Sequence, residues 1–410
     1  MSPVKSAPAE LTAGDSALRT RYLTEVLDLL YPAPCSIGNG SGPPIAEYLV
    51  VPDAHRPRLL VPAASRRIAA AAVRRYAEPQ SRTARLKRDA VVVALRTGAS
   101  AVLLRDRIRV SGPRAESIDA YLCAALGRDL AISIHIGPAR ANRKPVLQLI
   151  APNGETVGFS KIGTGPLTQR LVRAETSALT ALAGSSLTRL TVPRVLHAGQ
   201  WRGLAVLVQS ALPVWLPRAA LTPRRLTAAM LDIAGCCGGA AGPLVGSAYW
   251  AELRGRLAAV VDRAEGRALA AAVDLIGQHA GEIGLRYGSW HGDWAPWNMA
   301  NLADALLVWD WERFATGVPA GFDAVHHELQ KRIQAGGSPT AAVEATVRQA
   351  GELLTPFGVD GPARELTVLL YLVDLAVRYL TDRQAEAGAR LGVLGTWLLP
   401  VLIRRVEELS

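Results

Sequence analysis

The sequence predicts an α+β protein in which a β-rich part is followed by a mainly helical part. Alternating apolar residues predict five strands in the first part, at 132–136, 146–150, 156–162, 192–198 and 204–208. Between the second and third of these, Pro152-Asn153-Gly154 is typical of a tight hairpin turn. A helix is predicted at 167–182. After residue 217 helical periodicity dominates, and only a short strand pair near 298–310 interrupts it.

The first 129 residues are predicted to form a region of their own. Residues 1–14 are polar and predict a tail without regular structure. Apolar patterns then predict strands at 48–51, 59–61 and 101–110, and helices at 65–77, 82–96 and 116–126. We therefore expect three parts, namely an accessory α/β region of unknown role (1–129), a β-rich lobe (130–212) and a helical lobe (213–410).

The composition is that of a folded protein without a membrane anchor. Half of the 410 residues are hydrophobic and a fifth are charged. The longest apolar run near the end, 391–403, is too short to cross a bilayer. None of the four cysteines has the spacing of a metal ligand, which indicates reduced thiols. We expect a cytoplasmic protein that does not bind membranes, and the oligomeric state stays open.

Positive charge is concentrated in the first two thirds of the chain. Residues 281–410 hold 16 acidic and 11 basic side chains, a balance of −5, so the overall +11 leaves +16 for residues 1–280. A basic region of this size raises the possibility of nucleic-acid or membrane binding. However, its arginines stand among alanines without interleaved aromatic residues, which favours a solvated surface and no nucleic-acid partner. They are Arg56, Arg58, Arg66, Arg67, Arg74, Arg75, Arg82, Arg85 and Arg88.

The strongest chemical signal is the segment His291-Gly292-Asp293, followed by Asn298 and Asp310. Phosphoryl transfer needs a carboxylate that orients the attacking hydroxyl, and oxygen ligands that hold magnesium against the nucleotide phosphates. Asp293, Asn298 and Asp310 supply these groups. A predicted hairpin that turns at 303–304 would bring Asn298 close to Asp310 across the strand pair.

A second signal joins Lys161 and Glu175. Lys161 shares a face of its predicted strand with Val157 and Phe159, so it points toward apolar surroundings. Glu175 lies inside the apolar stripe of the next predicted helix. Because an unpaired buried charge is costly, we expect the two side chains to form an ion pair. A purely structural ion pair is the alternative.

Together these residues resemble the aminoglycoside phosphotransferase and choline kinase-like family, over roughly residues 130–410. The resemblance implies a protein-kinase-like bilobal fold that binds ATP and Mg²⁺. It implies that Asp293 is the catalytic base, that Asn298 and Asp310 bind magnesium, and that Lys161, fixed by Glu175, binds the phosphates. His291 would brace the loop rather than react.

The resemblance also implies further positions around the nucleotide. Gln209 to Leu212, including Ala211, would be the hinge against which adenine lies. Asp323 would stabilise the helical lobe. The loop 137–144 departs from the glycine-rich pattern of kinases, and Arg140, Arg143 or Lys144 could supply charge there instead.

The resulting expectation is a small-molecule kinase that phosphorylates a hydroxyl of an amino sugar, a sugar or a similar polar metabolite. Two alternatives stay open, namely an inactive pseudokinase that serves as a binding module, and a protein kinase that acts on a partner protein. We expect His326 and His327 to have surface or capping roles. The tryptophans near the motif could stack on a sugar ring, but most are expected in the core: Trp290, Trp294, Trp297, Trp309 and Trp311.

Overall fold

The computed structural model describes residues 8–38, 44–75, 82–99, 104–137, 141–386 and 391–409. The chain divides into two compact units, which are taken separately below. The first unit comprises residues 1–173 and 193–216, and the second comprises 174–192 and 217–410. Within the described ranges, every helix is too short or too polar to cross a membrane.

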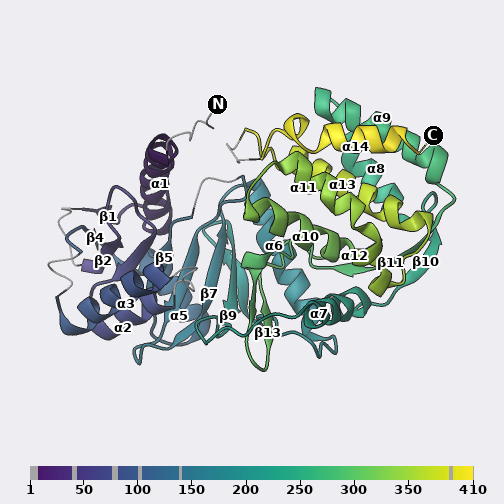
Figure 1. Ribbon diagram of the computed structural model, residues 1–410. Helices are drawn as coiled ribbons and strands as arrows, with labels where there is room; N and C mark the ends of the chain where they lie inside the picture. The colour runs from purple at the N-terminus through teal and green to yellow at the C-terminus, as the bar shows by residue number, and fades with distance from the viewer. Residues whose placement is uncertain are drawn as a thin grey trace, which may run out of the picture. The chain divides into compact units, whose positions relative to one another are not determined.

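The first unit is built on one nine-stranded antiparallel sheet with the strand order β1-β4-β2-β3-β5-β6-β7-β9-β8 (Figure 1). Together with the helical second unit, it confirms the α+β class. The strands are β1 (Ser36–Ile37), β2 (Pro44–Val51), β3 (Leu59–Pro62), β4 (Arg107–Ser111), β5 (Ala131–His135), β6 (Val146–Ile150), β7 (Thr156–Gly163), β8 (Val195–Trp201) and β9 (Leu204–Ser210).

The accessory region and the β-rich lobe share this sheet. Strand β3 pairs with β5, so that Leu59 lies opposite His135 and Leu60 lies opposite Ile134. The sheet hydrogen bonds therefore continue across residue 129. The strand expected at 101–110 is shorter than predicted, because β4 begins at Arg107, and residues 101–103 lie outside the described ranges.

Helices α1 (Pro8–Leu30) and α5 (Ile118–Leu126) share a core with one face of the sheet. Helix α5 is capped at its start by Ser117, whose hydroxyl accepts the Ala120 N–H, and ends at Gly127 in the left-handed conformation. The expected tail over 1–14 is wrong for residues 8–14, which belong to α1; residues 1–7 lie outside the described ranges. The missed signal is the apolar spacing of the buried residues Tyr22, Leu23, Val26, Leu27 and Leu30.

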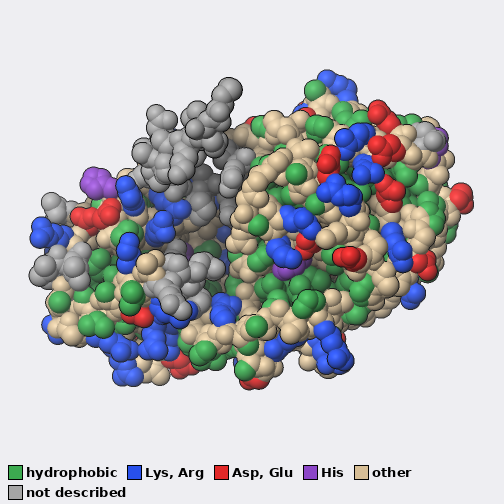
Figure 2. Space-filling model, viewed as in Figure 1, with side chains coloured by type: hydrophobic (Ala, Val, Ile, Leu, Met, Phe, Trp, Pro, Cys, Tyr) green, Lys and Arg blue, Asp and Glu red, His purple; other side chains and the backbone are tan. Residues whose placement is uncertain are grey.

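Helices α2 (Arg66–Arg74) and α3 (Arg82–Thr97) form a second core with residues of β2, β3 and β6. The alanines and valines of this core face inward, among them Ala69, Ala72 and Val92, whereas Val93 on α3 is exposed. Arg66, Arg67, Arg74 and Arg85 are exposed. Figure 2 shows Lys and Arg side chains gathered over these two helices, with hydrophobic side chains among them.

The second unit is mainly helical and also contains two small sheets. The helices are α7 (Pro223–Gly235), α8 (Ala248–Ala258), α9 (Ala264–Ala280), α10 (Phe322–Ala335), α11 (Pro339–Arg348), α12 (Ala350–Leu354), α13 (Pro362–Thr381) and α14 (Leu399–Glu407). Helix α6 (Pro166–Ala183) crosses the boundary between the units. The most buried helix is α13, which is apolar on nearly all sides and packs against α8, α9, α10 and α14.

The expected strand pair is present as β12 (Met299–Asn301) and β13 (Leu306–Val308). The expectation that no other strands follow residue 217 is wrong. A three-stranded sheet joins β10 (Ala240–Pro243), β11 (Gly284–Trp290) and β14 (Ala315–Pro319). Two of these strands are four or five residues long and contain glycine and proline, so tertiary pairing rather than local propensity makes them strands.

Candidate active site

The candidate site lies in the second unit, on the loop between β11 and β12 that carries His291, Asp293 and Asn298. The chain turns sharply at Gly292, whose φ is +82°. A Cβ atom at this position would lie 2.2 Å from the carbonyl oxygen of Arg313. Only glycine satisfies both the positive φ and this close approach, so Gly292 determines the path of the loop.

The backbone around Gly292 is held from two helices. Asp323, in the first turn of α10, accepts the N–H groups of His291 (2.7 Å) and Gly292 (3.2 Å). Arg378 of α13 donates to the carbonyl oxygen of Gly292 (2.5 Å). Burial raises the pKa of Asp323 to about 7, although the two N–H groups oppose this shift.

His291 is fully buried, and both of its ring nitrogens have hydrogen-bond partners. Its Nε2 lies 3.0 Å from the carbonyl oxygen of Trp309, and its Nδ1 lies 3.1 Å from the backbone nitrogen of Asp293. Because the Asp293 N–H can only donate, Nδ1 accepts and Nε2 carries the hydrogen. Burial lowers the pKa of His291 to about 4, so the ring is neutral at physiological pH. This neutral ring connects the loop to the segment after β13.

Asn298 fixes one side of Asp293. Its Nδ2 donates to the carbonyl oxygen and to Oδ2 of Asp293, both at 2.9 Å. The Asp293 side chain is 37% exposed, whereas Asn298 is buried. The Asp293 carboxylate is thus oriented by the protein and still reachable from outside.

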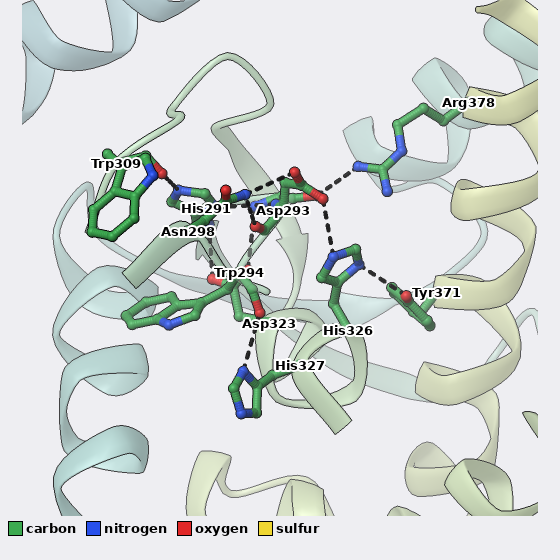
Figure 3. A network of polar contacts seen from close by, with 11 residues as sticks. His291, Asp293, Trp294, Asn298, Trp309, Asp323, His326, His327, Tyr371 and Arg378 are labelled. Carbon is green, nitrogen blue, oxygen red and sulfur yellow. Dashed lines mark hydrogen bonds and ion pairs between the residues drawn. The ribbon is translucent and has the colours of Figure 1, made fainter. Parts of the chain in front are cut away.

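The other side of Asp293 faces a residue whose role the sequence analysis missed. His326 is fully buried, and its Nε2 lies 3.2 Å from Asp293 Oδ1 (Figure 3). Its Nδ1 lies 2.9 Å from the hydroxyl of Tyr371 on α13. The expected surface or capping role of His326 is therefore wrong. The expectation for His327 is also wrong, because this residue is buried and its Nδ1 lies 3.2 Å from the carbonyl oxygen of Trp294.

A sequence signal for these contacts exists in hindsight. Asp323, His326 and His327 stand at positions i, i+3 and i+4 of α10, so they share one face of the helix. The resemblance implies only that Asp323 stabilises the helical lobe; in the structure this face of α10 contacts the loop, so its helical neighbours meet the loop as well.

The Asp293 carboxylate is surrounded by groups that favour its ionised form. Burial alone would raise its pKa, but His326 and the positive charge of Arg378 outweigh that effect and hold the pKa below its usual range. Burial lowers the pKa of His326, which therefore faces Asp293 as a neutral ring at physiological pH.

Asn298 and Asp310 flank the short hairpin β12–β13. Met299 pairs with Val308, and the Trp309 N–H donates to the Asn298 carbonyl oxygen (3.0 Å). Asp310 follows directly and has a φ of +70°, a conformation that is uncommon outside glycine and concentrates at functional sites. The hairpin thus brings the two segments side by side, as predicted.

These two residues provide oxygen donors of the kind that magnesium prefers. Asn298 uses its Nδ2 on Asp293, which leaves Oδ1 as the atom available to a cation. Among the residues that the structure describes, no group of three or more His, Cys, Asp or Glu side chains could hold a metal by itself. A pair of ligands fits a Mg²⁺ ion whose other positions are filled by phosphate oxygens and water.

Most of the tryptophans near the loop are in the core, as expected. Trp294 and Trp311 are fully buried, and Trp290 is 6% exposed. Trp297 differs, because it is 41% exposed beside Asn298.

In the first unit, Lys161 and Gln209 lie on the same face of the sheet. Phe159 is opposite Gln209 in the β7–β9 pair, and Lys161 is two residues further along β7. Both polar side chains are buried, and Gln209 Oε1 has no hydrogen-bond partner among the described residues. The Ala211 N–H donates to the Val157 carbonyl oxygen (3.3 Å) and is therefore already used within the sheet.

Glu175 is completely buried in α6. Because it belongs to the second unit and Lys161 to the first, their pairing stays a prediction.

The loop between β5 and β6, where phosphate contacts were expected, carries a basic side chain that already packs against helix α1. The Arg143 guanidinium lies over the ring of Tyr22 in α1, 3.6 Å from its centre, and Lys144 follows it in the described part of the loop. Arg19, also in α1, donates to the Ile136 carbonyl oxygen (3.0 Å). Arg140 lies outside the described ranges. Helix α1 therefore contacts the chain on both sides of residues 138–140.

No protein-family profile and no curated protein matches the chain. Solved structures do match it. A protein described as a fructosamine-3-kinase from Thermobifida fusca is 17% identical, with a TM-score of 0.42, over 72% of this chain and 98% of that one. A thermostable mutant of an aminoglycoside phosphotransferase is 13% identical, with a TM-score of 0.44, over 70% and 99%. A spectinomycin phosphotransferase, in complex with ADP and spectinomycin, is 14% identical, with a TM-score of 0.43, over 71% and 98%.

Proposed function

We propose that this protein is an ATP-dependent phosphotransferase that moves the γ-phosphoryl group to a hydroxyl of a small polar molecule, such as a sugar or an amino sugar. The single observation that carries the proposal is the arrangement around Asp293. Its carboxylate is ionised, partly exposed and oriented by Asn298, and the hairpin β12–β13 brings Asp310 beside Asn298. A carboxylate with two adjacent oxygen ligands is the set of groups that phosphoryl transfer requires.

In this mechanism Asp293 accepts a hydrogen bond from the acceptor hydroxyl and takes up its proton as the oxygen attacks the γ-phosphorus. The bond between the γ-phosphorus and the bridging oxygen breaks, and ADP leaves. Asn298 and Asp310 would hold Mg²⁺, which supplies positive charge against the phosphate oxygens when it is bound. Lys161 would bind the phosphates, and the hinge that begins at Gln209 would contact the adenine ring.

The acceptor class rests on the motif and on similarity to small-molecule kinases, of which one holds spectinomycin and another, an amicoumacin kinase, holds AMP-PNP and Ca²⁺. The test is a screen of the purified protein for Mg²⁺-dependent ATP turnover with a panel of sugars, amino sugars and aminoglycosides. Acceptor-dependent ADP release that is absent in Asp293→Asn supports the proposal. Failure of every acceptor together with Mg²⁺-independent ATP binding favours a binding module.

A further inference from the structure

The strongest unassigned feature is a chain of three groups that leads from the partly exposed Asp293 to two buried side chains inside the second unit. Asp293 Oδ1 lies 3.2 Å from His326 Nε2, and His326 Nδ1 lies 2.9 Å from the Tyr371 hydroxyl. His326 and Tyr371 are both completely buried, and their rings meet edge to face with centres 5.8 Å apart. Figure 3 shows His326 between the carboxylate and Tyr371.

The chemistry of the two ends fixes the hydrogens on the imidazole. An ionised carboxylate can only accept, so the nitrogen that faces Asp293 carries a hydrogen. A neutral imidazole has one N–H, which leaves Nδ1 as the acceptor of the Tyr371 O–H. The two partners therefore select one tautomer and one orientation of His326.

The contact between Nε2 and Oδ1 is at ion-pair distance, but the N–H is not aligned as a full hydrogen bond. Catalytic hydrogen bonds are often long before the substrate binds and shorten in the reactive complex. The ring is completely buried, and Asp293 Oδ1 is the acceptor atom that the structure places beside Nε2.

The chain is also anchored to the elements that hold the catalytic loop. Helix α10 supplies Asp323 for the loop backbone, His327 for Trp294 and His326 for the Asp293 side chain. Helix α13 supplies Tyr371 and, seven residues later on the same face, Arg378 for the Gly292 carbonyl oxygen. One face of each helix therefore contributes to the position of the loop, α10 at its backbone and carboxylate and α13 through Tyr371 and Arg378.

We propose that His326, oriented by Tyr371, is a positioning residue for Asp293: it holds Oδ1 from inside the unit while Asn298 holds Oδ2, so that the carboxylate meets the acceptor hydroxyl in one orientation. This role rests on the proposed phosphotransferase function. It predicts a specific effect on turnover, because a misplaced base slows the reaction without weakening nucleotide binding.

The kinetic test compares His326→Gln, which keeps an N–H donor, with His326→Leu, which keeps only the volume. The probe is Mg²⁺-dependent hydrolysis of ATP, with water as the acceptor. We expect His326→Leu to lower kcat roughly 10–100-fold at unchanged KM for ATP. His326→Gln should recover much of that loss, and Tyr371→Phe should show a smaller decrease. Thr346→Val, which removes a buried hydrogen bond inside α11, is the control for lost stability.

The proposal is overturned if Gln and Leu at position 326 lower kcat equally, or only in proportion to their melting temperatures as Thr346→Val does.

A second measurement does not depend on activity. With histidine labelled by ¹⁵N, NMR should show His326 of the intact protein as the neutral Nε2–H tautomer, and this preference should weaken in Tyr371→Phe. An Nδ1–H tautomer in the intact protein contradicts the proposal. Absent hydrolysis with the expected tautomer counts against the proposed function alone.

Discussion

Asn298 donates the same amide group to two oxygens of Asp293, one in the backbone and one in the carboxylate. Each of the two side chains therefore restricts the rotation of the other. The amide nitrogen fixes the rotation of the Asp293 carboxylate, and this use of the nitrogen determines that the Asn298 oxygen is the atom left for a cation. The proposed base and the proposed metal ligand are thus positioned by one side-chain contact.

The first prediction follows from this contact. Asp293→Asn keeps the shape but removes the proton acceptor, so kcat should fall by about 10²–10⁴-fold. The melting temperature and the affinity for ATP should change little. Steady-state kinetics and calorimetry measure these quantities, and near-normal turnover in the variant would contradict the assigned mechanism.

The second prediction concerns the metal. If Asn298 and Asp310 bind Mg²⁺ together with the nucleotide, ATP should raise the melting temperature much more in the presence of Mg²⁺ than in EDTA. Asp310→Ala should remove most of that difference, whereas substitution of the nearby exposed Asp304 to Ala should preserve it. An equal shift with and without Mg²⁺ in the unsubstituted protein would exclude the metal site.

The third prediction concerns Gly292. Substitution by alanine places a Cβ 2.2 Å from a backbone oxygen and forces an L-residue to a φ of +82°. The backbone conformation alone costs about 1–3 kcal/mol, and the clash adds to it. We expect Gly292→Ala to lower both stability and turnover. Gly317→Ala is the control, because that glycine also has a positive φ but open space around its Cα.

The fourth prediction concerns acid stability. Burial lowers the pKa of His327 to about 4. Between that value and the ordinary value near 6.5, the unfolded chain binds more protons than the folded protein, so stability falls as the pH drops through this range. His327→Gln should therefore reduce the loss of melting temperature between pH 6.5 and 4.

Asp323 has the opposite effect on the pH dependence of stability. Because its pKa is raised to about 7, the folded protein binds more protons at this carboxyl than the unfolded chain does below that pH, so stability rises as the pH drops. For this reason the test is the difference between variants and not the slope of one protein. Exposed His279→Gln serves as the matched histidine control. An identical pH dependence in the two variants would refute the contribution of His327.

The sequence predicts the elements that carry their own periodicity, but not those made by tertiary pairing. The hairpin of β6 and β7 and the strand pair β12–β13 were predictable, because turn residues and alternation are local signals. The strand β10, with the sequence Ala-Ala-Gly-Pro, has no such signal and exists only because it pairs with β11. The site shows the same division. Asp293 and Asn298 were predicted as site residues from their spacing in the sequence. His326 could not be predicted, because it contacts Asp293 only through the packing of α10 against the loop.

The last prediction concerns residues 1–129, which we propose to be a structural part of the first unit and not a separate binding module. Leu60 and Leu122 from this region are completely buried in one core with Ile134, Leu147 and Val208. Since β3 also pairs with β5, removal of residues 1–129 would expose an apolar sheet face and an unpaired strand edge.

We therefore expect residues 130–410 to be insoluble alone and to be rescued by co-expression of residues 1–129. In the full chain, Leu122→Ala should cost about 2–5 kcal/mol of unfolding free energy, because it leaves a cavity in the shared core. Leu86→Ala is the control, since Leu86 is 70% exposed on α3. Denaturant unfolding measures both.

The binding-module alternative makes the opposite forecast, namely a soluble, folded fragment 1–129 whose affinity for RNA or DNA falls steeply with salt as counterions are released. Such a fragment, together with a soluble and unchanged 130–410, would refute the structural role.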